Sequence, residues 1–288
     1  MLKLGKIRIE PIVEHNVPVY RPTDMFDEAT PQALEPYREW LEPLALCPIS
    51  GNLIMPVIAY LVRTDHHMIL IDTCCGKDKN YAEPAEWHEP ANELWMTRLL
   101  SVGVKPEDID FVFCTHLHSD HCGWNTRLVD GRWEPTFPNA KYVISREEYL
   151  DTEREGSSIF TDNVLPVAQA GQVQLVDLDY RLDDQVWLEP TVGHSAGHVA
   201  VHLRSKNRHA VMCGDLIHSP LQLAEPRWNC NSDWNIPKAI ETRLTFLDEH
   251  CETDHLILTS HFPLPSMGNI VTGKFGFDFN YVDYCGCL

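Results

Sequence analysis

The run from Thr115 to His121 carries the densest set of metal-ligand side chains in this sequence. It places three imidazoles and one carboxylate within six residues, directly after the apolar run Phe111 to Cys114. Residues spaced in this way cannot all share one face of a helix or of a strand. We therefore predict a loop at a strand end, in which His116 and His118 turn to one point and Asp120 and His121 to a neighbouring one. Such a loop could hold two metal ions, and these ligands suit zinc, or iron, manganese or cobalt.

Length and charge narrow the class of protein. The chain has 288 residues, of which 44% are hydrophobic and 23% charged, as in an ordinary globular protein. Lys and Arg number 23 against 42 Asp and Glu, a formal net charge of −19. This balance disfavours binding to nucleic acid or to anionic membranes. No apolar run approaches the roughly 20 residues that span a bilayer. We expect a small, neutral or weakly charged substrate, with no nucleic-acid or membrane partner.

Ten cysteines would suggest a disulfide framework only in a short secreted chain. The first residues lack the apolar stretch of a signal peptide, and several cysteines lie in or beside apolar runs, as small core residues do. We therefore expect a cytoplasmic protein. Two close pairs could bind metal or take part in redox chemistry, but neither has a partner pair at zinc-knuckle spacing, so an inert role is favoured for Cys74, Cys75, Cys285 and Cys287.

The hydrophobic pattern predicts strands in clusters separated by single helices. Strands are predicted at 6–14, 53–63, 68–72, 111–114, 141–144, 173–178, 185–189, 199–204, 210–213 and 256–259, and helices at 92–102, 146–152 and 235–249. A Pro-rich acidic stretch with a helical patch at 31–42 interrupts the pattern. This order suits an α+β sandwich of two mixed sheets with outer helices. We predict one domain over 1–288, in which 1–50 form an N-terminal strand and a flap-like excursion.

Three later positions repeat one arrangement, a metal-ligand side chain just beyond an apolar strand. His194 follows Gly193, Asp215 follows Gly214, and His261 follows the run 256–260. Loops at one edge of a sheet sandwich can converge on one point. His198, four residues after His194, is either structural or exchanges with it as a ligand.

At these residues the chain resembles the metallo-β-lactamase superfamily of metallohydrolases. The likeness lies in the order of His-x-His-x-Asp-His, Gly-His, Gly-Asp and a late His, and runs from about Asn52 to Ile270. The sequence departs from the family where Cys74-Cys75 replaces the glycine that usually follows Asp-Thr. The stretch 260–268 is most similar to the methyl parathion hydrolase branch, near the acyl-homoserine lactonases. The resemblance implies an αββα sandwich.

The resemblance also implies a ligand set for two divalent ions, with zinc expected and iron, manganese or cobalt open. One ion would take His116, His118 and His194, the other Asp120, His121 and His261, with Asp215 bridging both. The presence of Asp215 favours the two-metal hydrolases over the antibiotic-degrading lactamases. A hydroxide that two cations share stays nucleophilic near neutral pH. Asp120 would orient this hydroxide or carry its proton to the leaving group.

Other side chains near the ligand loops have open roles. Asp72 is expected either to accept a hydrogen bond from a ligand imidazole or to cap a turn. His218 could donate to the substrate or lie on the surface. Four aromatic residues could wall a pocket or belong to the core, namely Trp124, Trp228, Trp234 and Phe262. The remaining histidines are interpreted as non-ligands: His15, His66, His67, His88, His209, His250 and His255.

We therefore predict an enzyme, a dinuclear hydrolase that cleaves a lactone, an ester or a phosphotriester by attack of a metal-bridging hydroxide. A glyoxalase II-type thioesterase and an iron-dependent oxygenase or redox protein on the same scaffold are the rivals. A binding module that has lost activity is disfavoured by the intact ligand set. A nuclease is disfavoured by the acidic balance. The oligomeric state is open, and includes a homodimer.

Overall fold

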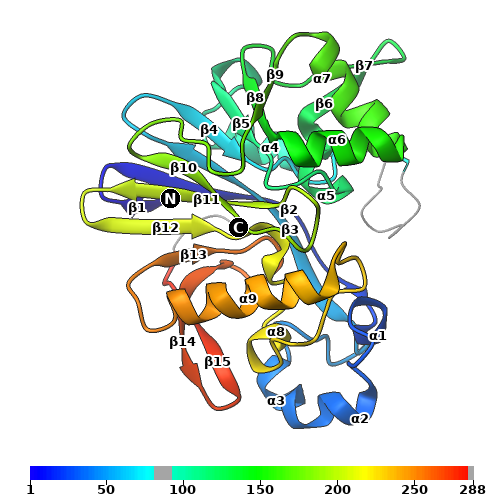
Figure 1. Ribbon diagram of the computed structural model, residues 1–288, viewed down its shortest axis with the longest axis vertical. Coiled ribbons are helices and arrows are strands. Elements are labelled where there is room, and N and C mark those ends of the chain that lie inside the picture. Colours follow the sequence, from blue (N-terminus) through cyan, green and yellow to red (C-terminus); the bar gives the residue numbers. More distant parts are fainter. Residues whose placement is uncertain (81–92, 285–288) are drawn as a thin grey trace.

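The computed structural model describes residues 1–80 and 93–284, and Figure 1 shows the arrangement of its elements. Three residues discussed above, His88, Cys285 and Cys287, lie outside this part of the chain. The first sheet has the strand order β1-β2-β3-β4-β5-β8-β9. Its strands are β1 (Leu2–Leu4), β2 (Ile7–Tyr20), β3 (Leu53–Arg63), β4 (Met68–Ile71), β5 (Phe111–Phe113), β8 (Lys141–Ser145) and β9 (Val173–Val176). The strands from β1 to β4 pair antiparallel and those from β4 to β9 pair parallel, so the sheet is mixed.

The second sheet has the order β10-β11-β12-β13-β14-β15. Its strands are β10 (Val186–Pro190), β11 (Val199–Ser205), β12 (Arg208–Met212), β13 (Leu256–Leu258), β14 (Met267–Gly273) and β15 (Gly276–Tyr281). Only β12 and β13 pair parallel. A separate hairpin joins β6 (Thr126–Val129) to β7 (Arg132–Pro135). The last strand predicted from the sequence ends at 259, and this prediction was wrong. Strands β14 and β15 follow it, and they carry glycines and half-buried polar residues in place of an apolar run.

Helices cover the outer faces of both sheets (Figure 1). The α-helices of the described residues are α1 (Pro22–Met25), α2 (Pro31–Leu34), α3 (Arg38–Leu41), α4 (Leu94–Ser101), α5 (Ser119–Cys122), α6 (Arg146–Glu155), α7 (Leu165–Gln169), α8 (Leu221–Ala224) and α9 (Ile236–His250). Helix α9 begins where the Asn235 side chain accepts a hydrogen bond from Lys238 N. Its Phe246 and Leu247 pack on the outer face of the second sheet, against Val211 and Ile257. None of the helices in the described ranges is long and apolar enough to cross a membrane.

The core lies in layers. Between the sheets, residues such as Tyr60 and Ile71 of the first sheet belong to one buried core cluster with Val201 and Met212 of the second. A second apolar layer separates the first sheet from α4 and α7. The αββα sandwich predicted from the sequence is confirmed by this layering.

The stretch that follows β2 is packed against the rest of the protein. Phe26, Leu34 and Leu41, from the short helices α1 to α3, are buried against Met55 of β3 and Leu221 of α8. The strand predicted at 6–14 also continues to Tyr20. Both features bring the N-terminal part of the chain to the strand ends beside the loop that contains His116 and His118.

Candidate metal centre

Seven side chains proposed from the sequence as metal ligands meet in one place. They come from the ends of several strands: His116 and His118 follow β5, His194 follows β10, Asp215 follows β12 and His261 follows β13, while Asp120 and His121 lie on α5. All seven side chains except that of His118 are buried. The strand ends of both sheets therefore build the cluster together.

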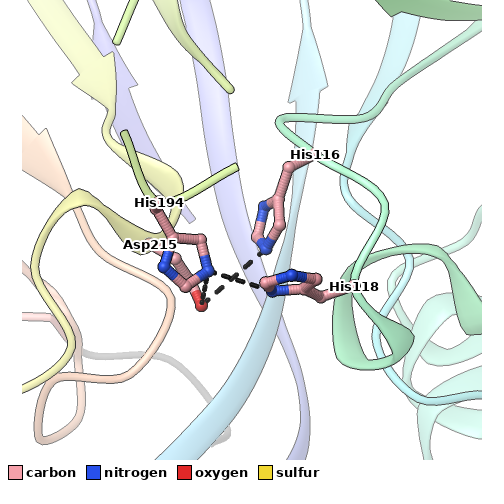
Figure 2. A group of neighbouring side chains, drawn as sticks. All are labelled: His116, His118, His194 and Asp215. Carbon is pink, nitrogen blue, oxygen red and sulfur yellow. Dashed lines mark hydrogen bonds and ion pairs between the residues drawn. The ribbon is translucent and has the colours of Figure 1, made fainter. Parts of the chain in front are cut away.

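The first group consists of His116, His118, His194 and Asp215, each of which offers one ligand atom within 4.8 Å of the others. His194 Nε2 lies 2.9 Å from His118 Nδ1 and 3.5 Å from Asp215 Oδ2. His116 Nε2 lies 3.9 Å from the same oxygen. Figure 2 shows the three imidazoles turned toward one another and toward Asp215.

The second group consists of Asp120, His121, Asp215 and His261, again within 4.8 Å. Asp215 Oδ1 lies 3.0 Å from His121 Nε2 and 3.2 Å from His261 Nε2. Asp120 Oδ2 lies 3.5 Å from each of these two nitrogens. Asp215 thus turns one oxygen to each group.

Several buried polar atoms at this junction form no well-directed hydrogen bond with the described residues, although some lie close together: His116 Nε2, His121 Nε2, Asp215 Oδ1 and His218 Nε2. A buried polar atom without a partner costs about 1–3 kcal/mol, so several together at one point need an explanation. Imidazole nitrogens and carboxylate oxygens are ligands of zinc and similar ions. The residues present fit two divalent cations, one in each group.

The charge states of the cluster support this fit. Burial, together with the imidazoles of His121 and His118, holds the pKa of His116 well below its usual range. Burial acts to raise the pKa of Asp120, but His121 and His261 outweigh it and lower that pKa to about 2. In Asp215 the same opposing effects leave the pKa well below its usual range. Burial acts to lower the pKa of His121, but the carboxylates of Asp215 and Asp120 outweigh it and raise that pKa well above its usual range. The carboxylates thus attract positive charge to the second group, and a cation would supply this charge once His121 gives up its proton.

Asp72 holds the second group in place. Its Oδ2 lies 2.9 Å from His121 Nδ1, and its Oδ1 accepts hydrogen bonds from the backbone and the hydroxyl of Thr115. A carboxylate on the far nitrogen of a ligand imidazole fixes its ring orientation and tautomer. Of the two roles expected for Asp72, the contact with a ligand imidazole is the one found.

Asp233, which was not predicted from the sequence, contacts the far ring nitrogen of His194, as Asp72 contacts that of His121. Asp233 Oδ1 lies 2.9 Å from His194 Nδ1, and Arg243 of α9 lies 3.3 Å from the other oxygen of this carboxylate. The Arg243 guanidinium is itself buried and donates to the backbone carbonyls of Leu216 and Pro226. Asp233 is far in sequence from every ligand motif, so no local pattern marks it.

Sequence reasoning also missed Glu148, which joins two ligand loops. Its buried carboxylate accepts hydrogen bonds from Leu117 N at 2.9 Å, Ser195 Oγ at 2.7 Å and Gly197 N at 2.9 Å. The loop that carries His116 and His118 is thereby tied to the loop that carries His194.

His198 has a structural role. Its Nε2 accepts a hydrogen bond from Asp215 N at 3.1 Å, and its Nδ1 lies 2.8 Å from Thr191 Oγ1. Both ring nitrogens are therefore occupied in positioning the backbone at Asp215, which favours this role over ligand exchange with His194.

A cavity of about 200 Å³ opens over the two groups. Asp120, Asp215 and His261 lie in its wall, and the other lining residues are Tyr20, Met25, Met55, His118, Ser119, Ile159, His218 and Ser232. His218 Nε2 lies 3.3 Å from Asp215 Oδ2, so this histidine faces the cavity and not the surface. The apolar part of the wall comes mainly from the N-terminal stretch and β3.

The aromatic residues proposed as pocket walls do not line this cavity. Trp124 is buried and stacks on Trp95 with ring centroids 5.5 Å apart. Phe262 is buried and packs edge-on against Phe279. Trp228 packs against Tyr37, and Trp234 is exposed. Trp234 does line a neighbouring hollow, which also contains His118 and His194. For Trp124 and Phe262, proximity to a ligand loop in sequence was a poor guide, because both rings pack in the core.

Comparison with known proteins agrees with the fold and the ligand pattern. Residues 55–257, more than half of the chain, match the family model of the metallo-beta-lactamase superfamily. The chain belongs to the metallo-beta-lactamase superfamily.

Curated relatives within this superfamily include lactonases. An N-acyl homoserine lactonase of Bacillus cereus is 28% identical over 173 residues, covering 56% of this chain and 64% of the relative. The N-acyl homoserine lactonase AiiB of Agrobacterium fabrum is 34% identical over 85 residues, or 26% of this chain and 31% of that protein. The match thus spans a little under two thirds of the length of the Bacillus relative.

Solved structures show the same fold over nearly the whole length. AidC, described as a dizinc quorum-quenching lactonase in complex with a product, superimposes with a TM-score of 0.82 at 21% identity, over 99% of this chain and 97% of that one. The hydrolase AbOPH gives a TM-score of 0.81 at 21% identity, with the same coverage.

Proposed function

We propose that this protein is a dinuclear metal-dependent hydrolase that opens lactones or cleaves related esters. The observation that carries the proposal is the position of Asp215, whose two oxygens face two separate ligand groups beneath a cavity. His116, His118 and His194 would hold one cation, and Asp120, His121 and His261 the other, with Asp215 shared. When bound, two such cations supply an activated water near neutral pH and polarise the scissile carbonyl.

Asp120 is suited to move a proton. Its carboxylate lines the cavity, and its pKa of about 2 keeps it ionised, so it would hold a proton only briefly and pass it on readily. The proton can then pass to the leaving alkoxide, which would otherwise depart as a poor, charged leaving group. His121 and His261, 3.5 Å from Asp120 Oδ2, keep this carboxylate turned toward the reacting atoms.

His218 is suited to bind the substrate. Its ring lies in the cavity wall, and its Nε2 is 3.3 Å from Asp215 Oδ2 without forming a well-directed hydrogen bond to the described residues. The backbone N–H of His218 donates to Gln222 Oε1 at 2.8 Å, and this contact fixes the start of the loop before α8. An N–H at His218 Nε2 could donate to a carbonyl oxygen of a bound ester, which would orient its scissile bond.

The cavity directly over the ligand groups is small. Its volume of about 200 Å³ is below the roughly 300–1,000 Å³ of pockets that enclose drug-sized ligands, and it adjoins a hollow of about 170 Å³ that shares His118, Ile159 and Ser232 with it. Tyr20, Met25, Met55 and Ile159 offer an apolar wall opposite the polar groups. We therefore propose a lactone with a short acyl substituent. The N-acyl homoserine lactonases among the relatives make that class the first to test.

A substrate panel with zinc-loaded enzyme tests the proposal. We expect turnover of short-chain acyl lactones and of simple aryl esters, lost on chelation and restored by zinc. Faster cleavage of thioesters than of any oxygen ester would favour the glyoxalase II-type alternative. Oxygen uptake by the iron-loaded protein, without hydrolysis, would favour a redox role. Full hydrolytic activity in a metal-free preparation would overturn the proposal.

A further inference from the structure

A third group of metal-ligand side chains lies apart from the two that share Asp215. It consists of Glu14 and His15 on β2 and Cys75 in the loop after β4, and one ligand atom of each lies within 4.8 Å of the other two. A carboxylate, an imidazole and a thiol at such separations form a mixed ligand set of the kind that zinc takes. From the sequence, His15 was interpreted as a non-ligand because it lies in no ligand motif, and Cys75 as inert because its pair lacks a partner pair at zinc-knuckle spacing.

An irregularity in the sheet creates this meeting. Neighbouring residues of a strand normally point to opposite faces. The register between β2 and β3 shifts here, since Val13 pairs with Ile58 and His15 with Val57, which leaves Glu14 without an opposite residue. A bulge of this kind re-aims side chains. It lets Glu14 and His15 approach the same cysteine.

The loop that carries Cys75 is held firmly at the group. Cys75 N donates to Glu14 Oε2 at 2.6 Å. Gly76 has a φ of 84°, and a Cβ there would come within 2.6 Å of the backbone of Gly123. The loop therefore packs against the residues just after α5 too closely for a side chain at this position, so the place of Cys75 is set by the backbone.

The burial of Glu14 favours a cation in this group. Glu14 is buried, and its two oxygens accept hydrogen bonds from Trp124 Nε1 and Cys75 N, both neutral donors, at 2.6 Å. Burial raises the pKa of Glu14 to about 7, against the lowering effect of these hydrogen bonds. A cation beside the carboxylate would offset the cost of burying its charge. His15 is half-buried and gives the group a side open to solvent.

We propose that Glu14, His15 and Cys75 form a third metal site, selective for a borderline transition-metal ion such as Zn²⁺ or Co²⁺. Thiolate and imidazole ligands disfavour Mg²⁺ and Ca²⁺, which prefer oxygen. On binding, the Cys75 thiol loses its proton to solvent and the thiolate sulfur forms the bond to the metal. A water can take the remaining position on the side of His15.

The site would support the dinuclear centre without taking part in the reaction. The same loop contains Asp72, which contacts His121 Nδ1, and Thr73, whose backbone N–H donates to His121 O at 2.8 Å. A metal at Cys75 would fix this loop to β2. Binding of an ion at Cys75 does not rest on the proposed function, whereas the two further ions counted in the test below do.

Cobalt loading of the full chain tests the site. The seven ligands around Asp215 contain no sulfur, so a thiolate-to-Co²⁺ charge-transfer band in the near ultraviolet must arise elsewhere. We expect three Co²⁺ per chain and such a band in the wild type. Cys75→Ser should bind two Co²⁺ and lose the band, while the control Cys47→Ser should retain both the third ion and the band.

A second variant, His15→Gln, tests the site even if the Cys75→Ser protein does not fold. His15→Gln removes the imidazole of a half-buried ligand. It should weaken binding of the third Co²⁺ by about 10-fold or more, because even the loss of a group that only supports a ligand has an effect of this size. Because the thiolate must be deprotonated, affinity for the third ion should rise with pH. A wild-type chain that binds only two Co²⁺ without the band would overturn the proposal, as would a band that persists in Cys75→Ser. Loss of hydrolysis alone would bear only on the dinuclear centre.

Discussion

Asp233 and His194 form a contact that neither residue's sequence context indicates: Asp233 Oδ1 lies 2.9 Å from His194 Nδ1, and Arg243 holds the other oxygen of the same carboxylate. The contact leaves His194 Nε2 directed at the first ligand group. A helix on the outer face of the second sheet thus reaches the candidate metal centre through one buried ion pair.

Removal of that carboxylate should weaken the first metal group. We expect Asp233→Ala to lower the affinity for one of the two zinc ions around Asp215 by about 10- to 100-fold, because His194 loses the partner that orients its ring. Competition with a chromogenic chelator measures this affinity. Asp179→Ala, which removes an exposed carboxylate, is the control. Unchanged affinity in Asp233→Ala would show that the contact does not orient the ligand.

Glu148 should stabilise the fold through the two loops that it joins. In Glu148→Gln, one carboxylate oxygen becomes an amide NH₂ that faces N–H and O–H donors, so at least one buried hydrogen bond is lost. We expect the free energy of unfolding to fall by about 2 kcal/mol. Urea denaturation of the chelated protein measures it, with the exposed Glu147→Gln as the matched control. Equal stability of the two variants would contradict this role.

A cluster of histidines between α9 and the second sheet should make the protein sensitive to acid. Burial first, and then the imidazoles of His202 and His255, lower the pKa of His209 to about 4. Burial and His255 lower the pKa of His250 to about 4 as well. Since the unfolded chain has the higher pKa, its histidines take up protons first. The stability held at neutral pH is therefore lost as pH falls from about 6.5 toward 4.

Replacement of His209 tests whether this histidine cluster causes the loss of stability in acid. His209→Asn removes one group that titrates in this window, so the free energy of unfolding should fall less between pH 7 and pH 5 than in the wild type. Urea denaturation of the chelated proteins at both pH values gives the difference. The exposed residue His66, changed to Asn, is the control. A slope in His209→Asn equal to that of the wild type would contradict the pKa assignment.

Asp120 should matter more for turnover than for folding. We expect Asp120→Asn to lower kcat for a short-chain lactone by about 10²-fold or more, because the amide cannot accept the proton that the carboxylate carries. Steady-state kinetics in excess zinc, with circular dichroism as the check on folding, measures this. An Asp120→Asn enzyme with near wild-type kcat would rule out proton transfer at this position.

The sequence predicted those parts of the fold that rest on local periodicity. The strand predicted at 53–63 is β3 with the same bounds, and the helix predicted at 235–249 is α9 shifted by one residue. Strands β14 and β15 escaped prediction because their stability comes from pairing along the sheet edge and not from an apolar run.

The candidate site, too, has residues that could be predicted from the sequence and residues that could not. Four of the seven ligands stand together in the run 115–121, and the other three each follow an apolar strand, so the family resemblance could join them into one set. Glu148, Asp233 and Glu14 could not, because their roles arise from tertiary contacts and from a bulge that no local pattern encodes. The cavity wall also depends on how α1 and β2 fold back over the strand ends, which sequence order does not reveal.

Anomalous diffraction from zinc-loaded crystals tests the central claim most directly. Two ions shared by Asp215 should give two strong peaks flanking this carboxylate, one beside Oδ1 near His121 and His261, the other beside Oδ2 near His116 and His194. A single peak, or none, at Asp215 in crystals grown with excess zinc would contradict a dinuclear centre.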